Sequence, residues 1–512
     1  MQPSNHRNRI SRIFGKRLLI VLLILIQLIF LVIMLYRSHQ LYWQAGLLTA
    51  LSVITAFHLL TRHDKASFKL SLVFLILLFP VFGGAFYWIF HFQTASVGYR
   101  RRLDNVAKKE QKCTPVSEQT LAMAQKALPK DQKLVRYLQN TAAFPVYNQT
   151  QSRYFPSGKE MLEVLLEDLE RAEHYIFLEY FIIAHGVMWD SILEILRRRA
   201  KCGVDVRIIY DDIGSIMTLP AKYDRELAKD GIQCRVFNRF HPFLTSIQNN
   251  RDHRKIAVID GKIAYTGGIN LADEYIDEKI RFGRWKDNSV RLHGSAAKGF
   301  AAMFLQMWEA LDRREEAIAP FLPTDDCEMK SDGWIQPYSD SPMKRENVGE
   351  HVYLHAIERT QRYLYITTPY LMVGDELMTA LKNCAKSGID VRIVTPGKPD
   401  KPMVHFTTRS CYRELLQAGI KVYEFAGGFI HAKTFISDGD LAIVGTVNMD
   451  FRSLYLHFEC GTCLYQTESV KRIEEDFHAT LSQCRRIDEK DCKTNFFVKL
   501  LQDVCRIFAP LM

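Results

Sequence analysis

The residues with the greatest chemical potential in this 512-residue chain form a tetrad that occurs twice. The copies are His253-Arg254-Lys255 with Asp260 and Asn270, and His431-Ala432-Lys433 with Asp438 and Asn448. The His-to-Lys, Lys-to-Asp and Asp-to-Asn spacings are identical in both copies. Two histidines with matched cations and amides are the groups that a phosphodiester exchange needs: one attacking base, one proton donor and shared donors for the phosphate oxygens.

The chemistry of such a site follows from the ionisation of its groups. A neutral imidazole can attack phosphorus and form a phosphohistidine without first losing a proton. A second, protonated histidine can give its proton to the leaving alcohol and later take one from the incoming nucleophile. Lys255, Lys433, Asn270 and Asn448 are predicted to hold the non-bridging oxygens and stabilise the transition state. No metal ion is needed for these steps, and we expect neither a metal nor a cofactor.

The elements around each tetrad must bring its side chains together. His-x-Lys has a period of two, which predicts that both side chains leave the same face of a strand. Asp260-Gly261 and Asp438-Gly439 are turn signals that end these strands. Gly267-Gly268 and Gly445 let the backbone come close to a ligand or a facing strand.

The tetrads belong to a wider internal repeat. Residues 200–209 (AKCGVDVRII) match residues 385–394 (AKSGIDVRIV), and Arg-Glu-Leu precedes Gly-Ile in both halves. Each half is predicted to run strand, helix, glycine, strand, helix, glycine, strand, and then the tetrad. Short apolar strands that alternate with helical patterns indicate an α/β fold with a mixed or parallel sheet flanked by helices. We expect two halves, residues 150–325 and 326–512, that pack about a pseudo-two-fold axis.

The twin motifs resemble the H-x-K-x(4)-D motifs of the phospholipase D superfamily, and the whole chain resembles bacterial cardiolipin synthases within it. The resemblance is carried by several motifs: His253–Gly261, Thr266–Asn270, Ala272–Tyr275, Trp285–Asp287, His431–Lys433, Gly445–Asn448 and Asp450–Ser453. It also covers the apolar N-terminal region and the C-terminal Ala509–Met512. There are departures: His457 stands where the family more often has Asn, Gly445-Thr446 replaces a Gly-Gly pair, and the first apolar segment is additional.

The resemblance implies a two-step transfer. One phosphatidylglycerol loses glycerol and leaves a phosphatidyl-enzyme, and a second phosphatidylglycerol attacks it to give cardiolipin. By analogy His253 is the nucleophile and His431 the acid/base, although the near-equivalence of the halves leaves the reverse assignment open.

Further residues complete the predicted site. The predicted catalytic set is His253, Lys255, Asp260, His431, Lys433 and Asp438, with the two aspartates supporting the motif turns. The predicted supporting set is Asn270, Asn448, Gly268, Thr446, Glu459 and Asp287. Glu459 and Asp287 can each orient a histidine through its second ring nitrogen.

The charge distribution bears on the partner. Residues 1–112 carry 15 Lys and Arg against three Asp and Glu, so the remaining 400 residues carry 52 against 54. The basic excess surrounds apolar segments, which indicates anionic membrane lipids rather than nucleic acid. The 11 scattered cysteines are typical of thiols in a reducing compartment.

Three apolar segments, Leu18–Tyr36, Leu41–Leu60 and Leu70–Phe90, predict an N-terminal membrane region over residues 1–95. A basic linker and lead-in is predicted over residues 96–149. Basic residues before Leu18 and at Arg100–Arg102 favour two spans plus one interfacial segment, in a multi-pass protein of the cell membrane whose catalytic region faces the cytoplasm.

Three other functions fit parts of the pattern. A phospholipase D hydrolase, or a transferase with another alcohol acceptor, would carry the same tetrads. A nuclease on the same scaffold is opposed by the membrane segments and the near-neutral catalytic region. An inactive membrane scaffold is opposed by the two intact tetrads.

Overall fold

The computed structural model describes residues 42–62, 65–79, 117–240, 249–312, 319–322, 329–344 and 346–511, with a few isolated positions. The chain forms two compact units, Met1–Gln93 with Phe240–Gln248, and Thr94–Arg239 with Asn249–Met512. In the first unit, α2 (Tyr42–Thr61) and α3 (Ala66–Leu78) pack together through Ala56, Leu59 and Ile76.

Only the second and third of the expected membrane segments correspond to helices that the structure describes. Leu18–Tyr36 lies outside the described residues. The second segment corresponds to α2, and the third overlaps α3, which already ends at Leu78. Among the helices that the structure describes, none combines the length and the apolar character that crossing a membrane requires.

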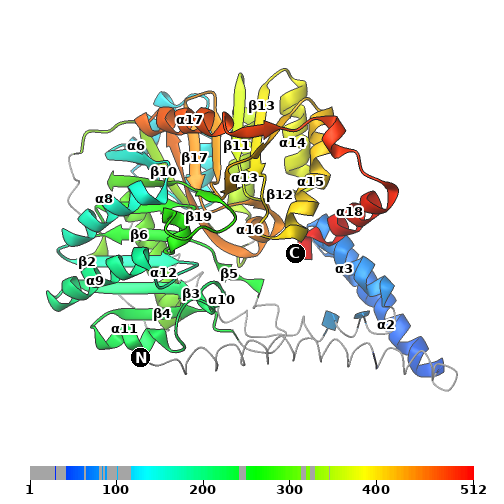
Figure 1. The fold of residues 1–512 in the computed structure, drawn as a ribbon, viewed down its shortest axis with the longest axis horizontal. Coiled ribbons are helices and arrows are strands. Elements are labelled where there is room, and N and C mark those ends of the chain that lie inside the picture. The colour runs from blue at the N-terminus through cyan, green and yellow to red at the C-terminus, as the bar shows by residue number, and fades with distance from the viewer. Residues whose placement is uncertain are drawn as a thin grey trace. The chain divides into compact units, whose positions relative to one another are not determined.

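The first half of the second unit is built on a seven-stranded mixed sheet in the order β1-β9-β7-β6-β2-β3-β4 (Figure 1). The run β2-β3-β4 is parallel and the other neighbours are antiparallel. Its elements are β1 (Thr150–Phe155), α8 (Gly158–Glu170), β2 (Tyr175–Tyr180), α9 (Val187–Lys201), β3 (Asp205–Asp211), α10 (Asp212–Ser215), α11 (Tyr223–Lys229), β4 (Gln233–Phe237), β5 (Arg251–Asp252), β6 (Lys255–Ile259), β7 (Ile263–Gly267), β8 (Arg284–Lys286), β9 (Ser289–Gly294) and α12 (Ala297–Asp312).

The second half repeats this topology in a sheet whose main path is β10-β19-β17-β16-β11-β13-β14-β20. Its elements are β10 (Trp334–Asp340), α13 (Val348–Arg359), β11 (Tyr363–Thr367), β12 (Leu371–Met372), α14 (Asp375–Lys386), β13 (Asp390–Pro396), α15 (Pro402–Gln417), β14 (Lys421–Phe425), β15 (Gly428–Ile430), β16 (Thr434–Ser437), β17 (Leu441–Gly445), β18 (Met449–Asp450), α16 (Phe451–Tyr455), β19 (His457–Tyr465), α17 (Glu468–Leu481), β20 (Cys484–Arg486) and α18 (Phe496–Phe508). The predicted mixed α/β fold with helix-flanked sheets is thereby confirmed.

Burial explains why these runs are strands. Every residue of β2, β6 and β17 is buried, because helices or the other half cover both faces of the sheet. Two helices precede β1: α6 (Glu118–Ala127) adds Ala124 to the core, and α7 (Gln132–Asn140) adds Leu134, Val135 and Leu138.

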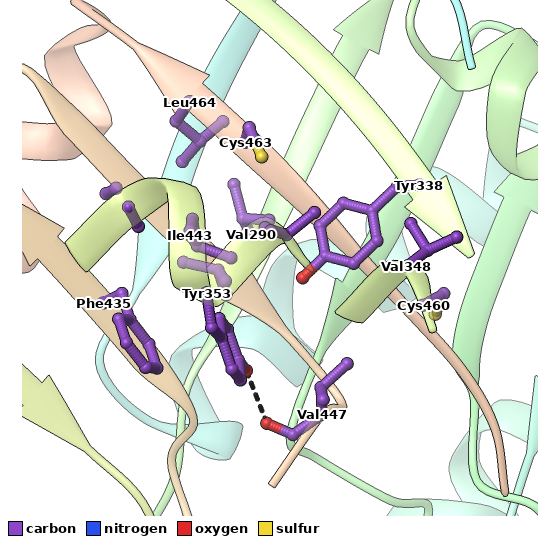
Figure 2. Close-up of a cluster of buried hydrophobic side chains, with 14 of the residues drawn as sticks. Val290, Tyr338, Val348, Tyr353, Phe435, Ile443, Val447, Cys460, Cys463 and Leu464 are labelled. Carbon is purple, nitrogen blue, oxygen red and sulfur yellow. Dashed lines mark hydrogen bonds between the residues drawn. The ribbon is translucent and has the colours of Figure 1, made fainter. Parts of the chain in front are cut away.

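One hydrophobic core joins the two halves. It includes nine residues of α12 and side chains of both sheets. Figure 2 shows part of it, where Val290 of β9 lies among Tyr338, Ile443 and Leu464 of the second half. The nine cysteines in the described part of the chain are all free thiols. The shared core makes the two sheets a single scaffold on which groups from both halves can be positioned.

Short strands are exchanged between the halves, and they correct one expectation. His253 lies two residues before β6, and His431 and Lys433 lie three residues and one residue before β16. The preceding β5 pairs with β19 of the other half, and β15 pairs with β8 of the other half. The backbone N–H of His253 donates to Phe458 at 2.9 Å, and that of His431 donates to Lys286 at 2.7 Å. Hydrogen bonds to the opposite half therefore hold each histidine outside its own sheet.

Candidate active site

The first histidine is held by a carboxylate from the opposite half. His253 Nδ1 lies 3.0 Å from both carboxylate oxygens of Glu459, which is fully buried on β19. Only 7% of His253 is exposed. Because Nδ1 is bound to Glu459, the free nitrogen of the ring is Nε2.

The second histidine shows the reciprocal arrangement. His431 Nδ1 lies 2.7 Å from Oδ2 of Asp287, which follows β8 in the first half. His431 is as buried as His253, with 7% of its surface exposed. Each half thus supplies one histidine and the carboxylate that orients the other histidine, so neither half contains a complete site.

The two carboxylates are supported differently. Glu459 accepts hydrogen bonds from the hydroxyls of Ser453, at 2.6 Å, and Thr446. Asp287 accepts one from the backbone N–H of Asn288 at 2.8 Å. At Gly268, which is equivalent to Thr446 in the repeat, a Cβ would lie 2.0 Å from Asp287 Oδ1. The shorter aspartate therefore needs glycine beside it, whereas the longer glutamate accommodates a threonine that donates to it.

Each motif lysine is hydrogen-bonded to the backbone of the histidine in its own motif. Lys255 Nζ donates to the carbonyl of His253 at 2.6 Å, and Lys433 Nζ donates to the carbonyl of His431. Both side chains are almost fully buried. An ammonium has three N–H donors, so each lysine keeps donors for an anionic ligand.

The two asparagines have unequal surroundings. Asn270 Oδ1 accepts the backbone N–H of Ile182 at 3.0 Å, and its Nδ2 donates to Tyr275 Oη at 2.6 Å. The side-chain oxygen of Asn448 is buried and has no hydrogen-bond partner among the described residues. Asn448 therefore has more of its amide available to a ligand than Asn270 does.

The motif aspartates lie at the far end of the strands from the histidines. Asp260 accepts three backbone N–H groups, from residues 173–175, each at 2.8 Å. Asp438 does the same for residues 361–363, at 2.8–3.2 Å. Both aspartates adopt a left-handed backbone, with φ of 52° and 55°. This geometry ties each turn to the strand that lies beside it.

Burial sets the protonation of the site. Desolvation lowers the pKa of His253 well below 6.5 and that of His431 to about 4. It also lowers the pKa of Lys255 to about 8 and that of Lys433 to about 7. Burial opposes the charge on Glu459, but its interactions with the histidines outweigh this and its pKa is lowered. Without a ligand, the site therefore holds neutral histidines and ionised carboxylates.

The charges of the two motifs act on one another. Lys255 lowers the pKa of both His431 and Lys433 through its charge. Tyr275 of the first half lies 5.8 Å from the ring of His431, between centroids. The charges of the two motifs are thus coupled, and the two tetrads form a single site.

Two residues of the site escaped the sequence analysis. Ser453 donates to Glu459, and its signal was its place in the Asp450–Ser453 motif. His457, noted only as a departure from the family, is buried beside His253 with 5.5 Å between ring centroids. Neither position has a spacing that reveals its partner.

The mixed α/β fold and the twin His-x-Lys motifs are those of an enzyme of the phospholipase D type. Comparisons with known proteins are consistent with this class. A family model described as "Cardiolipin synthase, PLD-like domain" matches residues 165–308 and 353–481. A cardiolipin synthase of Geobacillus sp. (strain WCH70) is 33% identical over 92% of this chain and 95% of its own length. An uncharacterized protein of Streptococcus mutans serotype c is 42% identical over 85% of this chain and 95% of its own length.

A solved structure supports the fold. The phosphatidylserine synthase of Haemophilus influenzae Rd KW20 superposes with a TM-score of 0.55 over 73% of this chain and 97% of its own, at 14% identity. The chain belongs to the cardiolipin synthase family of phospholipase D-like proteins.

Proposed function

We propose that this enzyme transfers a phosphatidyl group from one phosphatidylglycerol to another, which yields cardiolipin and glycerol. The observation that carries the proposal is the reciprocal arrangement of two motif histidines, each bound to a carboxylate of the other half. A related cardiolipin synthase matches this chain over 92% of its length, and this supports the choice of substrate.

The proposed reaction has two displacements at one phosphorus. His253 Nε2 attacks the phosphorus of the first phosphatidylglycerol, the bond to the glycerol oxygen breaks, and His431 gives its proton to that oxygen. The free glycerol hydroxyl of the second phosphatidylglycerol then gives a proton to His431 and attacks the phosphorus. The phosphorus–nitrogen bond breaks and neutral His253 is restored.

The supports of the two carboxylates favour this assignment of roles. Two hydroxyls donate to Glu459, which weakens its pull on a proton of His253 and keeps that ring neutral and nucleophilic. Asp287 has a short bond of 2.7 Å to His431 and one backbone donor. It can therefore stabilise an imidazolium once a negatively charged phosphodiester has raised the pKa of His431.

Product analysis tests the proposal. The full-length enzyme in detergent, with phosphatidylglycerol labelled in its terminal glycerol, should release labelled glycerol and form cardiolipin in equal amounts. Phosphatidic acid in place of cardiolipin would make the enzyme a hydrolase and contradict the proposal. Turnover of plain DNA but not of phosphatidylglycerol would assign it to the nucleases.

The low pKa values of the buried lysines predict that kcat/KM loses a contribution from phosphate binding at an unusually low pH. A lysine binds phosphate only below its pKa, so the loss of the Lys433 proton should add a further fall in kcat/KM of about tenfold per pH unit, from a pH of about 7. Lys433→Arg keeps its charge, and the limb should move up toward the pKa of Lys255, about 8. The profile of kcat/KM from pH 6 to 10 checks this, with Lys382→Arg as a control on the outer surface. A limb at the same pH in Lys433→Arg and wild type would contradict it.

We also propose that the enzyme works at the cell membrane as a multi-pass protein with its catalytic unit in the cytoplasm. The support is the basic excess of residues 1–112, the apolar sequence of Leu18–Tyr36 and the basic run Arg100–Arg102.

A second membrane contact is proposed for α18. Its exposed apolar side chains lie on one face of the helix: Phe496, Phe497, Leu500, Leu501, Val504 and Ile507. Cys505 is buried and turns a different face toward the catalytic unit.

Tryptophan placed on this face reports the contact. In vesicles that contain phosphatidylglycerol with brominated chains, Phe497→Trp should show quenching beyond that of the six native tryptophans. Lys499→Trp, on the polar face of the same helix, should show none. Equal extra quenching in the two variants, or none in either, would contradict a lipid contact of α18.

A further inference from the structure

His457 is buried beside the proposed nucleophile, and none of the described residues forms a hydrogen bond with its ring. Both of its ring nitrogens are buried and unpartnered within the described residues, and 8% of the residue is exposed. Its Nδ1 lies 3.6 Å from Glu459 Oε1, which is beyond hydrogen-bond range. Buried polar groups are nearly always paired, so a ring with two unpaired nitrogens indicates a missing ligand.

His253, His457 and Glu459 have the geometry of metal ligands. Each offers one ligand atom, and these atoms all lie within 4.8 Å of one another. Tetrahedral zinc has bonds of about 2.0–2.1 Å, which separate its ligands by about 3.3–3.4 Å. Glu459 Oε1 lies 3.0 Å from Nδ1 of His253 and 3.6 Å from Nδ1 of His457, on either side of that value. The two distances to Glu459 therefore need shifts of only a few tenths of an ångström, and the ligand atoms of the two histidines lie within 4.8 Å of each other.

We propose that these three residues bind a Zn²⁺-class transition-metal ion, which switches the enzyme off. Two imidazoles and a carboxylate suit zinc better than Mg²⁺ or Ca²⁺, which prefer sets made only of oxygen ligands. The fourth zinc position stays open to water. The ion binds Nδ1 of His253 in place of the proton that Glu459 accepts, and that proton moves to Nε2. The lone pair on Nε2 is then no longer available for attack, and the nucleophile is lost.

The surrounding charges set the strength of the site. Lys255 acts on Glu459 and His253 through its charge, and Arg452 acts on His457. These cations oppose a divalent ion, whereas the charges of Glu459 and Asp450 favour it. We therefore expect binding that a chelator readily reverses, as befits a switch rather than a structural site.

Binding is measured on the full-length enzyme without substrate. Titration of the chelator-treated enzyme with ZnCl₂, and with Co²⁺ as a spectroscopic probe, should show one ion per chain and tetrahedral Co²⁺ absorption. His457→Asn removes one ligand and should weaken zinc binding by at least about tenfold. Mutation of a residue that only supports a metal ligand already lowers metal affinity by about 10–100-fold. His185→Asn removes a histidine that lies 2.9 Å from Asp190 at the surface, and it should bind as wild type does. Equal affinity in His457→Asn and wild type would overturn the proposal.

A second measurement does not depend on how His457→Asn folds. X-ray absorption of the zinc-loaded wild type should show nitrogen and oxygen ligands, with histidine scattering. Sulfur ligands would place the ion on cysteines and overturn the site.

The inhibitory consequence rests on the proposed function, while the binding does not. ZnCl₂ should lower phosphatidyl transfer in wild type and His185→Asn, each relative to its own activity in chelator. The zinc concentration that halves this activity should be at least about tenfold higher in His457→Asn. If zinc binds at these residues and transfer is unaffected, inhibition is overturned. If the chelated enzyme does not act on phosphatidylglycerol at all, the proposed function fails and the site stands.

Discussion

Replacing His253 with alanine is expected to lower phosphatidyl transfer on the order of 10⁴-fold or more, because no other group replaces an attacking nitrogen oriented by Glu459. His431→Ala should cause a comparable loss with phosphatidylglycerol, since glycerol leaves poorly without a proton. Both losses are measured as kcat in detergent. His478→Ala, a surface histidine of α17, serves as the control.

A substrate with a better leaving group separates the two roles. A phosphatidyl ester of an acidic phenol departs without a proton, so His431→Ala should regain most of its ability to release the phenol in a first turnover. His253→Ala should regain none. Recovery in His253→Ala alone would reverse the assigned roles.

The exchanged carboxylates give the second large effect. Glu459→Gln and Asp287→Asn keep the shape of each side chain but remove its charge and replace one acceptor oxygen with a donor NH₂ group. The tautomer of the histidine is then no longer fixed. The equivalent change at the triad aspartate of a serine protease costs about 10⁴-fold in kcat, and we expect a loss of about 10²–10⁴-fold here.

The pairing across the halves predicts which variant the phenol substrate rescues. Asp287 serves His431, so Asp287→Asn should recover phenol release, whereas Glu459→Gln should not, because Glu459 serves His253. Asp168→Asn is a matched control: Asp168 is buried and binds Tyr265 and Arg291 away from the site. Any loss of activity in Asp168→Asn should be the same for the phenol substrate and for phosphatidylglycerol. Rescue of Glu459→Gln alone would contradict the exchanged pairing.

Much of this architecture was accessible from the repeat. The spacing of apolar runs and glycines gave the order from β2 to β4 and from β11 to β14, because alternating strands and helices leave a local signature. The match between the copies also marked His253 and His431 as one functional pair, since chance repetition of the full tetrad is improbable.

The cross-half contacts were not accessible in the same way. β5 pairs with β19 and β15 with β8, over about 200 and 140 residues of sequence. Local periodicity does not encode such pairing, which depends on how the shared core places the two sheets. For the same reason the strands were predicted to include the histidines, which lie two residues before β6 and three residues before β16. The lack of hydrogen-bond partners at His457 became apparent only once its neighbours were placed.

The most direct test of the central claim is to find the covalent intermediate. The enzyme is mixed with phosphatidylglycerol labelled in its phosphatidyl phosphate, quenched in alkali within one turnover, digested and mapped by mass spectrometry. We predict a phosphatidyl group on His253, absent from His253→Ala and discharged as cardiolipin on a chase with unlabelled phosphatidylglycerol. A label on His431, or cardiolipin formed in the first turnover with no labelled histidine, would contradict it.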